Sequence, residues 1–427
     1  MSNILIKNVD CLTLTEPVKI IKNTNVGISD NLISFVGKIP AGFKHDEIID
    51  GKNKLLMPGL INAHTHLAMS LFRNYAEDVD FWTWLNDKIL PAEEKLNREN
   101  VYWGSILSIA EMIKSGTTSF ADMYFFTEET AKAVEETGIR AMISRSVVSG
   151  ENSDKKLKES LDIFDKYNNT ADERITVCSA PHAIYSCDEI FLKEVIAESK
   201  KRNMQIHIHL SETEEEVNNC KTKHLMYPAE YLQNLGMFDL KTMVAHGVYL
   251  TDKEMDILKK YDVSVIHNPG SNLKLGNGIA PVVKMLKKGL NVALGTDGAA
   301  SNNNLNMFEE IYLATVLQKG IMKNSIAIKG IDAIKMATVN GARAMSLNNI
   351  GTVEKGNIAD LILIDTDKPH FYPKFDLISD LVYSAQAGDT DTVIVNGKIL
   401  MKYGNLLTID IERVYFEIEK QAEKLLK

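Results

Sequence analysis

The sequence predicts an α/β fold built on a (β/α)8 TIM barrel, with a small β-sandwich domain that both termini form together. Three observations on its 427 residues predict this fold. Eight strand-like segments alternate with helical patterns in the middle of the chain, each of them ends in polar or ionisable side chains, and both ends of the chain alternate in the strand period. We therefore expect residues 1–56 to begin the sandwich, residues 57–355 to form the barrel, and residues 356–427 to complete the sandwich and add a helix.

Both terminal segments carry hairpin signals. The N-terminal segment predicts a hairpin that turns at Asp30-Asn31, and the C-terminal segment predicts one at Asn396-Gly397, the strongest short-range signal for such a turn. Residues 412–427 place apolar side chains at helical spacing, with acidic residues first and basic residues last, which suits the helix dipole.

The barrel prediction rests on the strand-like segments of the middle region. Two of the helical patterns between them end in Asn203 and Gly289, residue types that tolerate the left-handed conformation of a helix C-terminus. A doubly wound open sheet is the alternative, but no G-x-G-x-x-G motif opens a helix here. The candidate strands are residues 58–66, 117–125, 139–148, 175–185, 204–210, 242–250, 263–271 and 291–299.

Composition and charge exclude several classes of protein. Hydrophobic residues make up 45% and charged residues 25%, which excludes a disordered, collagen-like or disulfide-scaffold chain. The formal charge of −9 argues against a nucleic-acid surface, which needs a basic face. The four cysteines form no CxxC pair, and the sequence has neither a signal-peptide pattern nor an apolar stretch of membrane-spanning length. We expect a cytoplasmic protein with no nucleic-acid or membrane partner.

The first candidate strand ends in His64-Thr65-His66. Because residues i and i+2 of a strand point to the same face, these two imidazoles can bind one metal ion. Two hydrogen-bonded histidines without a metal are the alternative. The fifth strand ends in a second pair, in which His209 is best placed to reach the barrel mouth as a third ligand. His207 lies deeper and is expected to be a core histidine.

Asp297 follows the eighth strand and is the expected oxygen ligand, with a helix N-cap as the alternative. Its neighbours Gly295 and Gly298 are expected to let the backbone turn tightly. Glu212, just past the fifth strand, is either a solvated acid or a proton carrier beside the metal. His246 is expected to orient the metal's water or relay its proton rather than to ligate, or else to be a buried histidine donating to a carbonyl.

Three histidines and one aspartate favour Zn²⁺ or another borderline divalent ion with room for water. Such an ion lowers the pKa of bound water from about 15.7 to about 7. The fourth strand offers no lysine that could bridge two metals, so the sequence predicts one metal per subunit and hydrolytic chemistry. The remaining strand ends carry Asp122, Arg145, His182, and His267 with Asn268.

The segments PGLINAHTH, HLSE, VAHG and LGTDGAASNN resemble, in order and spacing, those of the amidohydrolase superfamily over nearly the whole chain. The segments NLKLGNGIAP and WTWLNDKILPAEE bring the resemblance closer, to its cytosine-deaminase/chlorohydrolase-like branch and the 5-methylthioadenosine/S-adenosylhomocysteine deaminases. The resemblance implies hydrolytic removal of the 6-amino group of an adenine nucleoside, such as 5′-methylthioadenosine, S-adenosylhomocysteine or adenosine.

The resemblance also implies roles for single residues. Glu212 would protonate the ring nitrogen next to the reacting carbon, Asp297 would take the water proton, and His246 would stabilise the attacking oxygen. The metal would be held by His64, His66, His209 and Asp297. The substrate would be bound by Glu93 at the ribose hydroxyls, Arg145 at the amino-acid carboxylate and His182 at the purine, with Trp84 either stacking on the base or belonging to the core.

One segment departs from the resemblance, and other functions stay open. Relatives that use S-adenosylhomocysteine can present a second arginine after the third strand, where this chain has Lys155 and Lys156, point charges without the arginine fork. This makes S-adenosylhomocysteine a less secure substrate than methylthioadenosine or adenosine. The alternatives are a related hydrolase acting on guanine, cytosine or a chlorotriazine ring, and a catalytically silent barrel scaffold. By analogy of fold, the chain can form a homo-oligomer.

Overall fold

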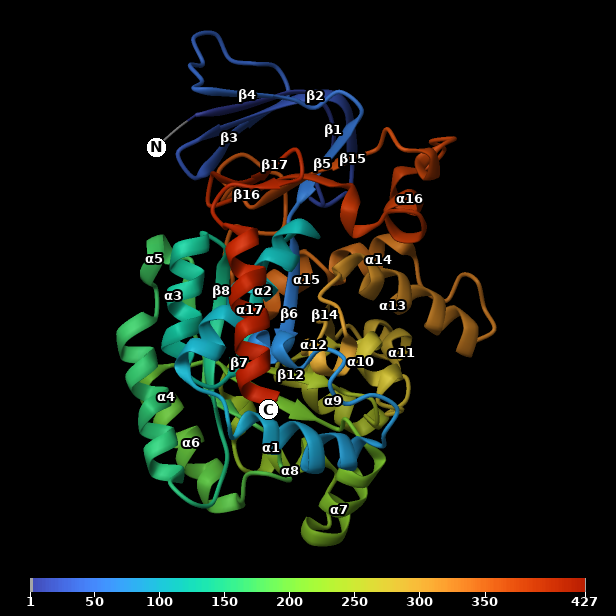
Figure 1. The fold of residues 1–427 in the computed structure, drawn as a ribbon. Coiled ribbons are helices and arrows are strands. Elements are labelled where there is room, and N and C mark those ends of the chain that lie inside the picture. Colours follow the sequence, from blue (N-terminus) through green and yellow to red (C-terminus); the bar gives the residue numbers. More distant parts are fainter. Residues whose placement is uncertain (1–2, 427) are drawn as a thin grey trace.

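The computed structural model describes residues 3–426 of the chain. Its centre is a barrel of parallel strands whose first strand, β6, follows directly on the strand β5 of the terminal sheet, so the strands run away from that sheet (Figure 1). The predicted α/β fold with a TIM barrel is confirmed. The barrel strands are β6 (Leu60–Thr65), β7 (Thr117–Tyr124), β8 (Arg140–Val147), β9 (Ile175–Val177) continued by β10 (Ala180–Pro181), β11 (Ile206–Leu210), β12 (Thr242–His246), β13 (Ser264–His267) and β14 (Asn291–Leu294).

Two runs of paired strands make up the barrel, β6 to β10 and β11 to β14. A parallel bridge between Ser179 and Ile206 joins the runs on one side. On the other side the backbone N–H of Asp297 donates to the carbonyl of His64 at 3.0 Å. This closing contact brings the residue after the last strand beside the first strand.

Strand alternation explains why β11 presents two histidines to the barrel axis. Ile206, Ile208 and Leu210 pack in the main apolar core together with residues of the surrounding helices. His207 and His209 lie between them in the strand and therefore point to the opposite face, inside the barrel. Both side chains are buried.

Helices surround the barrel on its outer side (Figure 1). The predicted ends at Asn203 and Gly289 have positive φ angles of 53° and 74°, as expected. The long helices are α2 (Arg98–Lys114), α3 (Thr127–Thr137), α4 (Ser153–Tyr167), α6 (Glu189–Arg202), α7 (Glu214–His224), α9 (Asp252–Lys260) and α13 (Met307–Ile321). The shorter ones are α1 (Leu90–Glu93), α5 (Thr170–Glu173), α8 (Pro228–Asn234), α10 (Pro269–Lys274), α11 (Val282–Lys287), α12 (Ala299–Asn302), α14 (Gly330–Met336), α15 (Val339–Ala344) and α16 (Leu377–Tyr383). Other helical turns are η1 (Leu67–Phe72), η2 (Thr83–Ile89), η3 (Met237–Asp239), η4 (Pro369–Phe371) and η5 (Ala387–Asp389).

The two ends of the chain form one nine-stranded sheet in the order β18-β17-β16-β15-β5-β1-β2-β3, with β4 paired to β1. N-terminal β5 pairs with C-terminal β15, and in Figure 1 the strands β1–β4 lie over β16 and β17. Apolar residues of both parts, among them Ile6, Ile28, Leu361 and Ile394, form one cluster. The strands are β1 (Ile4–Leu12), β2 (Ile20–Ser29), β3 (Leu32–Val36), β4 (Glu47–Asp50), β5 (Lys54–Pro58), β15 (Leu361–Asp365), β16 (Thr390–Val395), β17 (Lys398–Lys402) and β18 (Asn405–Leu406).

Both predicted hairpin turns are present. Asp30 has a positive φ of 56° between β2 and β3, and Asn396 and Gly397 have positive φ angles of 51° and 72° between β16 and β17. No helix of residues 3–426 is long and apolar enough to cross a membrane.

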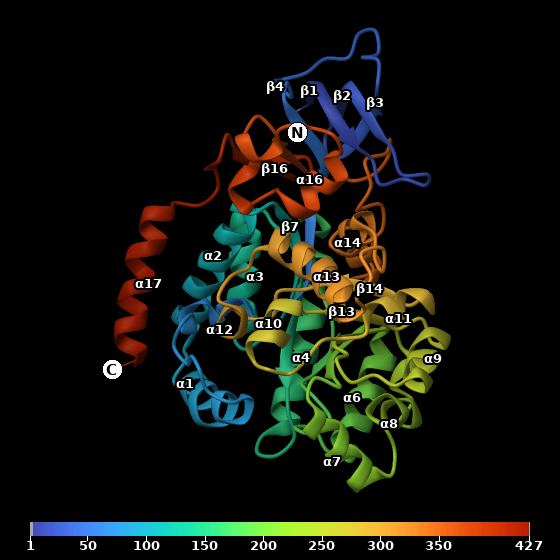
Figure 2. The same ribbon diagram turned by 90° about the vertical axis from the view of Figure 1, so that its right-hand side faces the viewer.

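The terminal helix α17 (Ile411–Leu426) leaves the sheet and runs along the barrel beside α2, as Figures 1 and 2 both show. The side-chain amide of Asn100 on α2 donates to Oε1 of Gln421 at 2.9 Å. The guanidinium of Arg413 lies 5.3 Å from the ring centre of Trp103. The helix therefore ties the end of the chain to the barrel wall.

Candidate active site

The carboxyl ends of the barrel strands open into a cleft of about 580 Å³. Its floor carries side chains from the ends of the first, fifth, sixth and eighth strands, as parallel barrels place them. They include His66, His209, Glu212, His246 and Asp297. Chemistry-bearing residues that lie far apart in the sequence thus meet in one enclosed space.

The four predicted metal ligands lie together at the floor of this cleft. Oδ1 of Asp297 is 3.4 Å from Nε2 of His64 and 3.3 Å from Nε2 of His66. Nε2 of His209 is 3.3 Å from Nε2 of His66. The ligand atoms of the three histidines lie within 4.8 Å of one another, a spacing that one ion can bridge. A second such group replaces two of them with His246 and Asp297.

The far side of each ligand imidazole is occupied by a hydrogen bond. Nδ1 of His66 lies 2.7 Å from the carbonyl oxygen of Met123, and Nδ1 of His209 lies 2.7 Å from that of His182. Nδ1 of His64 lies 2.9 Å from Nε2 of His207. In every case Nε2 is the nitrogen that faces the cluster.

The donor set fits a divalent metal. Nε2 of His64 is a buried polar atom without a hydrogen-bond partner among the described residues, and it faces the other three ligands. Burial lowers the pKa of His64 to about 4 and that of His209 well below its usual value, so both imidazoles are neutral at physiological pH. Burial also opposes protonation of His66, but the hydrogen bond to Asp297 and its charge raise this pKa to about 9. A metal ion held by His66 and Asp297 would remove this rise in pKa, because it would bind the same carboxylate and need a neutral imidazole.

Hydroxyl and amide groups hold Asp297 in place. Its Oδ2 accepts from the hydroxyls of Ser271 at 2.7 Å and Ser301 at 2.9 Å, and its Oδ1 accepts from the backbone N–H of Gly298 at 2.8 Å. Burial alone disfavours the charged form of Asp297. The hydrogen bonds and charges of His64 and His66 outweigh burial and hold the pKa of Asp297 well below its usual value. The carboxylate is therefore ionised, as a ligand must be.

The glycines beside Asp297 differ from the expectation. The residue with a positive φ is Asp297 itself, at 63°, whereas neither Gly295 nor Gly298 has one. A Cβ atom on Gly295 would lie 2.8 Å from the backbone nitrogen of His64. Gly295 therefore serves close approach of the eighth strand to the first, not a tight turn.

Glu212 is buried beside the cluster. Its Oε1 accepts from the side-chain amide of Asn277 at 2.9 Å, and its Oε2 lies 3.8 Å from Nε2 of His246. The carboxylate of Glu216 accepts from the backbone N–H of Glu212 at 2.8 Å, which fixes the loop after β11. Burial raises the pKa of Glu212 above its ordinary value. The interpretation as a solvated loop acid is wrong, because the side chain of Glu212 is only 6% exposed.

His246 is oriented by its other nitrogen. Nδ1 lies 2.8 Å from Oδ1 of Asn272 and 3.4 Å from the side-chain amide nitrogen of Asn268, so these two asparagines hold the ring with Nε2 toward the cleft. His246, the last residue of β12, has a positive φ of 74°, and its Nε2 lies 3.8 Å from Oε2 of Glu212.

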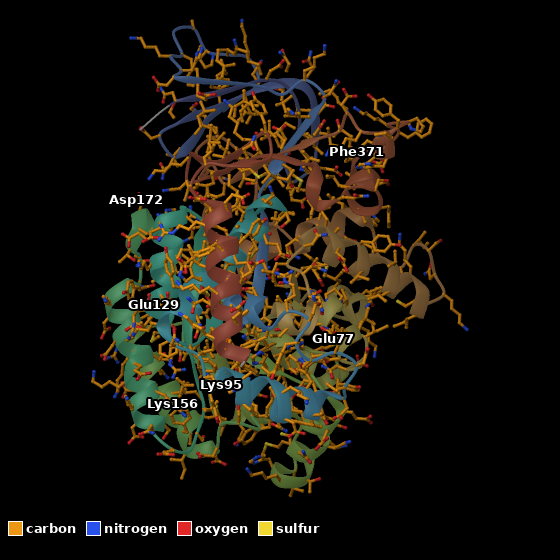
Figure 3. All side chains as sticks on the ribbon, viewed as in Figure 1. Glu77, Lys95, Glu129, Lys156, Asp172 and Phe371 are labelled. Atoms are coloured by element: carbon orange, nitrogen blue, oxygen red, sulfur yellow. The ribbon has the colours of Figure 1, made fainter. Side chains whose placement is uncertain are left out.

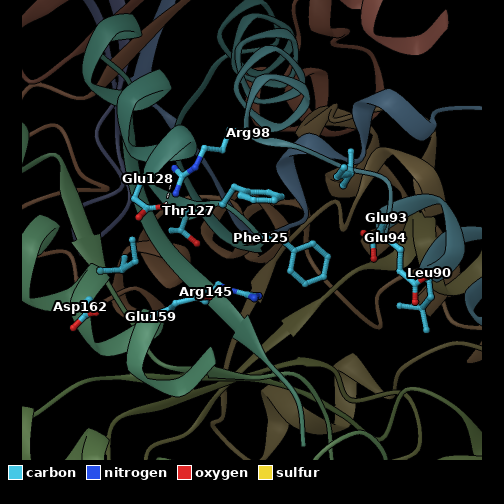
Figure 4. A pocket seen from close by; sticks show the side chains of 13 residues that line it. Leu90, Glu93, Glu94, Arg98, Phe125, Thr127, Glu128, Arg145, Glu159 and Asp162 are labelled. Carbon is cyan, nitrogen blue, oxygen red and sulfur yellow. Dashed lines mark hydrogen bonds and ion pairs between the residues drawn. The ribbon is translucent and has the colours of Figure 1, made fainter. Parts of the chain in front are cut away.

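Three of the predicted substrate contacts line the cleft, and one lies beside it. Trp84, Glu93 and His182 are in the cleft wall. Arg145 lines an adjoining hollow of about 540 Å³, which shares Leu90, Glu93 and Phe125 with the cleft. In Figure 4 the Arg145 side chain points toward Phe125, whose ring centre is 5.2 Å from the guanidinium.

Arg145 already has protein partners. Its Nε donates to Oε2 of Glu159 on α4 at 3.2 Å, and its Nη1 donates to the carbonyl of Ser146 at 2.6 Å. Lys155 and Lys156 lie on the same helix, but neither lines the cleft or the hollow; Lys156 is labelled on α4 in Figure 3. The second arginine that lines the hollow, Arg98, is also paired, with Glu128 and Glu129.

The remaining strand ends do not join the cluster. Oδ1 of Asp122 accepts from the backbone N–H of Leu67 at 2.7 Å and so holds the start of η1. His267 is buried, and neither of its ring nitrogens has a hydrogen-bond partner among the described residues. Polar strand ends in this barrel thus serve structure as well as the site.

Sequence reasoning missed the residues that hold the site in place. Ser271, Asn272, Asn277 and Ser301 orient Asp297, His246 and Glu212, and all four follow the strands in loops or short helices. The only available signal was their place inside the segments NLKLGNGIAP and LGTDGAASNN or just before them.

Comparisons with known proteins agree with this arrangement. Residues 55–400 match the family described as the amidohydrolase family. The chain is 51% identical to the 5-methylthioadenosine/S-adenosylhomocysteine deaminase of Caldanaerobacter subterraneus subsp. tengcongensis, over 100% of this chain and 99% of that protein. It is 45% identical to the 5′-deoxyadenosine deaminase of Methanocaldococcus jannaschii, over 95% and 97% of the two chains. A crystal structure of an adenosine deaminase from Xanthomonas campestris with bound zinc superposes with a TM-score of 0.94 at 29% identity, over 99% of this chain and 98% of that one.

Proposed function

The chain belongs to the amidohydrolase family, and on this basis we propose that it removes the 6-amino group of adenine nucleosides by metal-dependent hydrolysis, giving the inosine analogue and ammonia. The observation that carries the proposal is the meeting of His64, His66, His209 and Asp297 with the buried carboxyl of Glu212 in one cleft. The similarity over full length to deaminases of methylthioadenosine and 5′-deoxyadenosine directs the choice of substrate to 5′-substituted adenosines.

We assign the four ligands to one divalent ion per subunit, with Zn²⁺ as the best fit to three imidazoles and one carboxylate. When bound, the ion supplies a Lewis acid that makes water a nucleophile near neutral pH. Asp297, ionised and held by two serine hydroxyls, takes the proton of the attacking water. His246, which Asn272 holds with Nε2 toward the cleft, orients that water.

Glu212 supplies the proton that the ring needs. The amide of Asn277 donates to Oε1, which leaves Oε2 to carry the proton toward the cleft. Transfer to the ring nitrogen next to C6 makes that carbon more electrophilic, so water adds there. Asp297 then gives the proton it took from water to the exocyclic amine, the bond between C6 and that nitrogen breaks, and ammonia leaves. The hydroxyl on C6 becomes the carbonyl of the product and returns its proton to Glu212. A carboxyl with a raised pKa suits this task, because it holds its proton closer to neutral pH.

The cleft wall offers side chains for both the ribose and the base of a nucleoside. We propose that Glu93 accepts hydrogen bonds from the ribose hydroxyls, since its Oε1 is buried and has no hydrogen-bond partner among the described residues. His182, whose Nδ1 lies 2.8 Å from the hydroxyl of Ser186, faces the cleft where the purine would lie. Trp84 offers an apolar wall to the base.

A substrate panel tests the proposed function. Ammonia release is measured with the metal-loaded enzyme on methylthioadenosine, 5′-deoxyadenosine, adenosine, S-adenosylhomocysteine, adenine, guanine and cytosine. We expect the nucleosides to exceed the free bases in kcat/KM by at least about 100-fold, because buried polar groups that bind ribose stay unpaired with a free base. Turnover of free bases alone would show that the chain is a different ring hydrolase.

Arg145→Met is expected to change substrate preference. Loss of a hydrogen bond to a charged group costs about 1.5–3 kcal/mol, so kcat/KM for S-adenosylhomocysteine should fall by about 10- to 100-fold. Methylthioadenosine has no carboxylate, and its kcat/KM should change by less than about 3-fold. Arg202→Met is the matched control, because Arg202 pairs with Asp165 and Glu198 outside the cleft and the hollow. Equal losses on both substrates would exclude a role for Arg145 in binding the carboxylate.

A further inference from the structure

We infer that His207 is a positioning residue for the metal ligand His64: it accepts a hydrogen bond from Nδ1 of His64 and thereby keeps Nε2 of that ligand unprotonated. The inference rests on the proposed metal site and adds a residue to it. It also gives a separate task to each histidine of the pair on β11, since His209 is a ligand and His207 holds another ligand.

The contact between the two rings crosses the barrel. His64 is on β6 and His207 is on β11, the first and fifth of the eight barrel strands, so the residues approach the axis from opposite walls. Nδ1 of His64 and Nε2 of His207 are 2.9 Å apart, and the ring planes meet at 79°. Both side chains have 0% exposure. Water therefore does not compete for this hydrogen bond, and neither ring has room to reorient freely.

The partner at Nδ1 of each ligand histidine decides which ring nitrogen carries the proton. Main-chain carbonyls face Nδ1 of His66 and of His209, and a carbonyl can only accept, so it fixes the proton on Nδ1. His64 differs because its Nδ1 faces an imidazole nitrogen, which can accept or donate. If His207 donates, Nδ1 of His64 is the acceptor and the proton of His64 sits on Nε2. If His207 accepts, the proton of His64 sits on Nδ1 and Nε2 keeps the lone pair that a metal needs.

The proton arrangement of His207 follows. To accept at Nε2, His207 must be neutral and carry its own proton on Nδ1. An imidazole in this place also raises the electron density on His64 and so its strength as a ligand, as partners behind metal-binding histidines commonly do. Replacing His207 should therefore act on the affinity for metal before it acts on any chemical step.

A pair of variants of similar shape isolates the hydrogen bond. His207→Gln keeps an acceptor in the side chain, whereas His207→Met fills a comparable volume with only a weak acceptor. The zinc dissociation constant of each is measured by competition with a chelator of calibrated affinity, without any assay of turnover. We expect His207→Met to bind zinc about 10- to 100-fold more weakly than the wild type and His207→Gln to recover part of the loss.

His267→Met is the matched control, since His267 is buried in the same barrel and has no hydrogen bond to a ligand. Its zinc affinity should stay within about 3-fold of the wild type, whatever it loses in thermal stability. Far-UV circular dichroism and melting of the metal-free variants report folding separately. Unchanged zinc affinity in a folded His207→Met, or an equal loss in His267→Met, would overturn the inference.

A measurement on the unaltered holoenzyme decides the question if a variant does not fold. Nitrogen-15 NMR of labelled histidines should show His64 with its proton on Nδ1 and His207 with its proton on Nδ1. The opposite arrangement for either ring would overturn the inference. A wild-type protein that takes up no zinc at all would instead contradict the proposed metal site.

Discussion

Glu212→Gln should lower the rate of ammonia release from methylthioadenosine by about 100- to 10,000-fold, the range typical of general acid–base groups, with the metal content unchanged. Glutamine has nearly the same shape and can still accept the hydrogen bond from Asn277, so the cleft should keep its form. It cannot deliver a proton to the ring nitrogen. The measurement is steady-state ammonia release together with metal analysis of the same preparation.

Glu214→Gln is the control for this variant. Glu214 is an exposed acid two residues further on, at the start of α7, and the same change of charge there should leave the rate within about 2-fold. In the wild type, kcat/KM should fall as the pH rises through the raised pKa of Glu212, because the ionised form has no proton to give. Substantial turnover by Glu212→Gln would remove this residue from the proposed mechanism.

His66→Ala should abolish stoichiometric metal binding and reduce activity to background. This histidine contributes a nitrogen that lies 3.3 Å both from Oδ1 of Asp297 and from Nε2 of His209, so its loss opens one side of the donor set. A ligand that binds only the folded state adds about 4 kcal/mol of stability at a concentration a thousand times its dissociation constant. Added zinc should therefore raise the melting temperature of the wild type and not that of the variant.

His45→Ala is the control for histidine removal, because His45 is exposed and lies in the loop between β3 and β4 of the terminal sheet. It should keep full metal content and the same zinc-dependent rise in melting temperature. Retention of one tightly bound zinc by His66→Ala would contradict the ligand set.

The barrel and the floor of its site could be predicted because their signals are local. Alternation within a strand places both His207 and His209 on one face, and closure of a parallel barrel brings residues at strand ends together whatever their distance in the chain. Strand position and the family resemblance together pointed to His64, His66, His209 and Asp297, and the structure brings these four side chains close together.

The supporting contacts could not be predicted, because they depend on how loops return to the site. Nothing in the residue type of Ser271 or Asn277 indicates that its side chain reaches Asp297 or Glu212, and similar residues occur in many surface loops. Arg145 was correctly placed at a strand end, yet its side chain lies in a neighbouring hollow beside Phe125. Rotamer and loop geometry decide such cases, and strand periodicity carries no information about either.

The pairing of β5 with β15 has a consequence for biosynthesis. Leu56 pairs with Leu363 across these antiparallel strands. β5 is therefore synthesised about 300 residues before the strand with which it pairs. Until the ribosome has delivered that partner, the early strands present an unpaired edge, the kind of surface that invites association between nascent chains. Completion of the sheet is thus a late event, which cannot precede synthesis of β15.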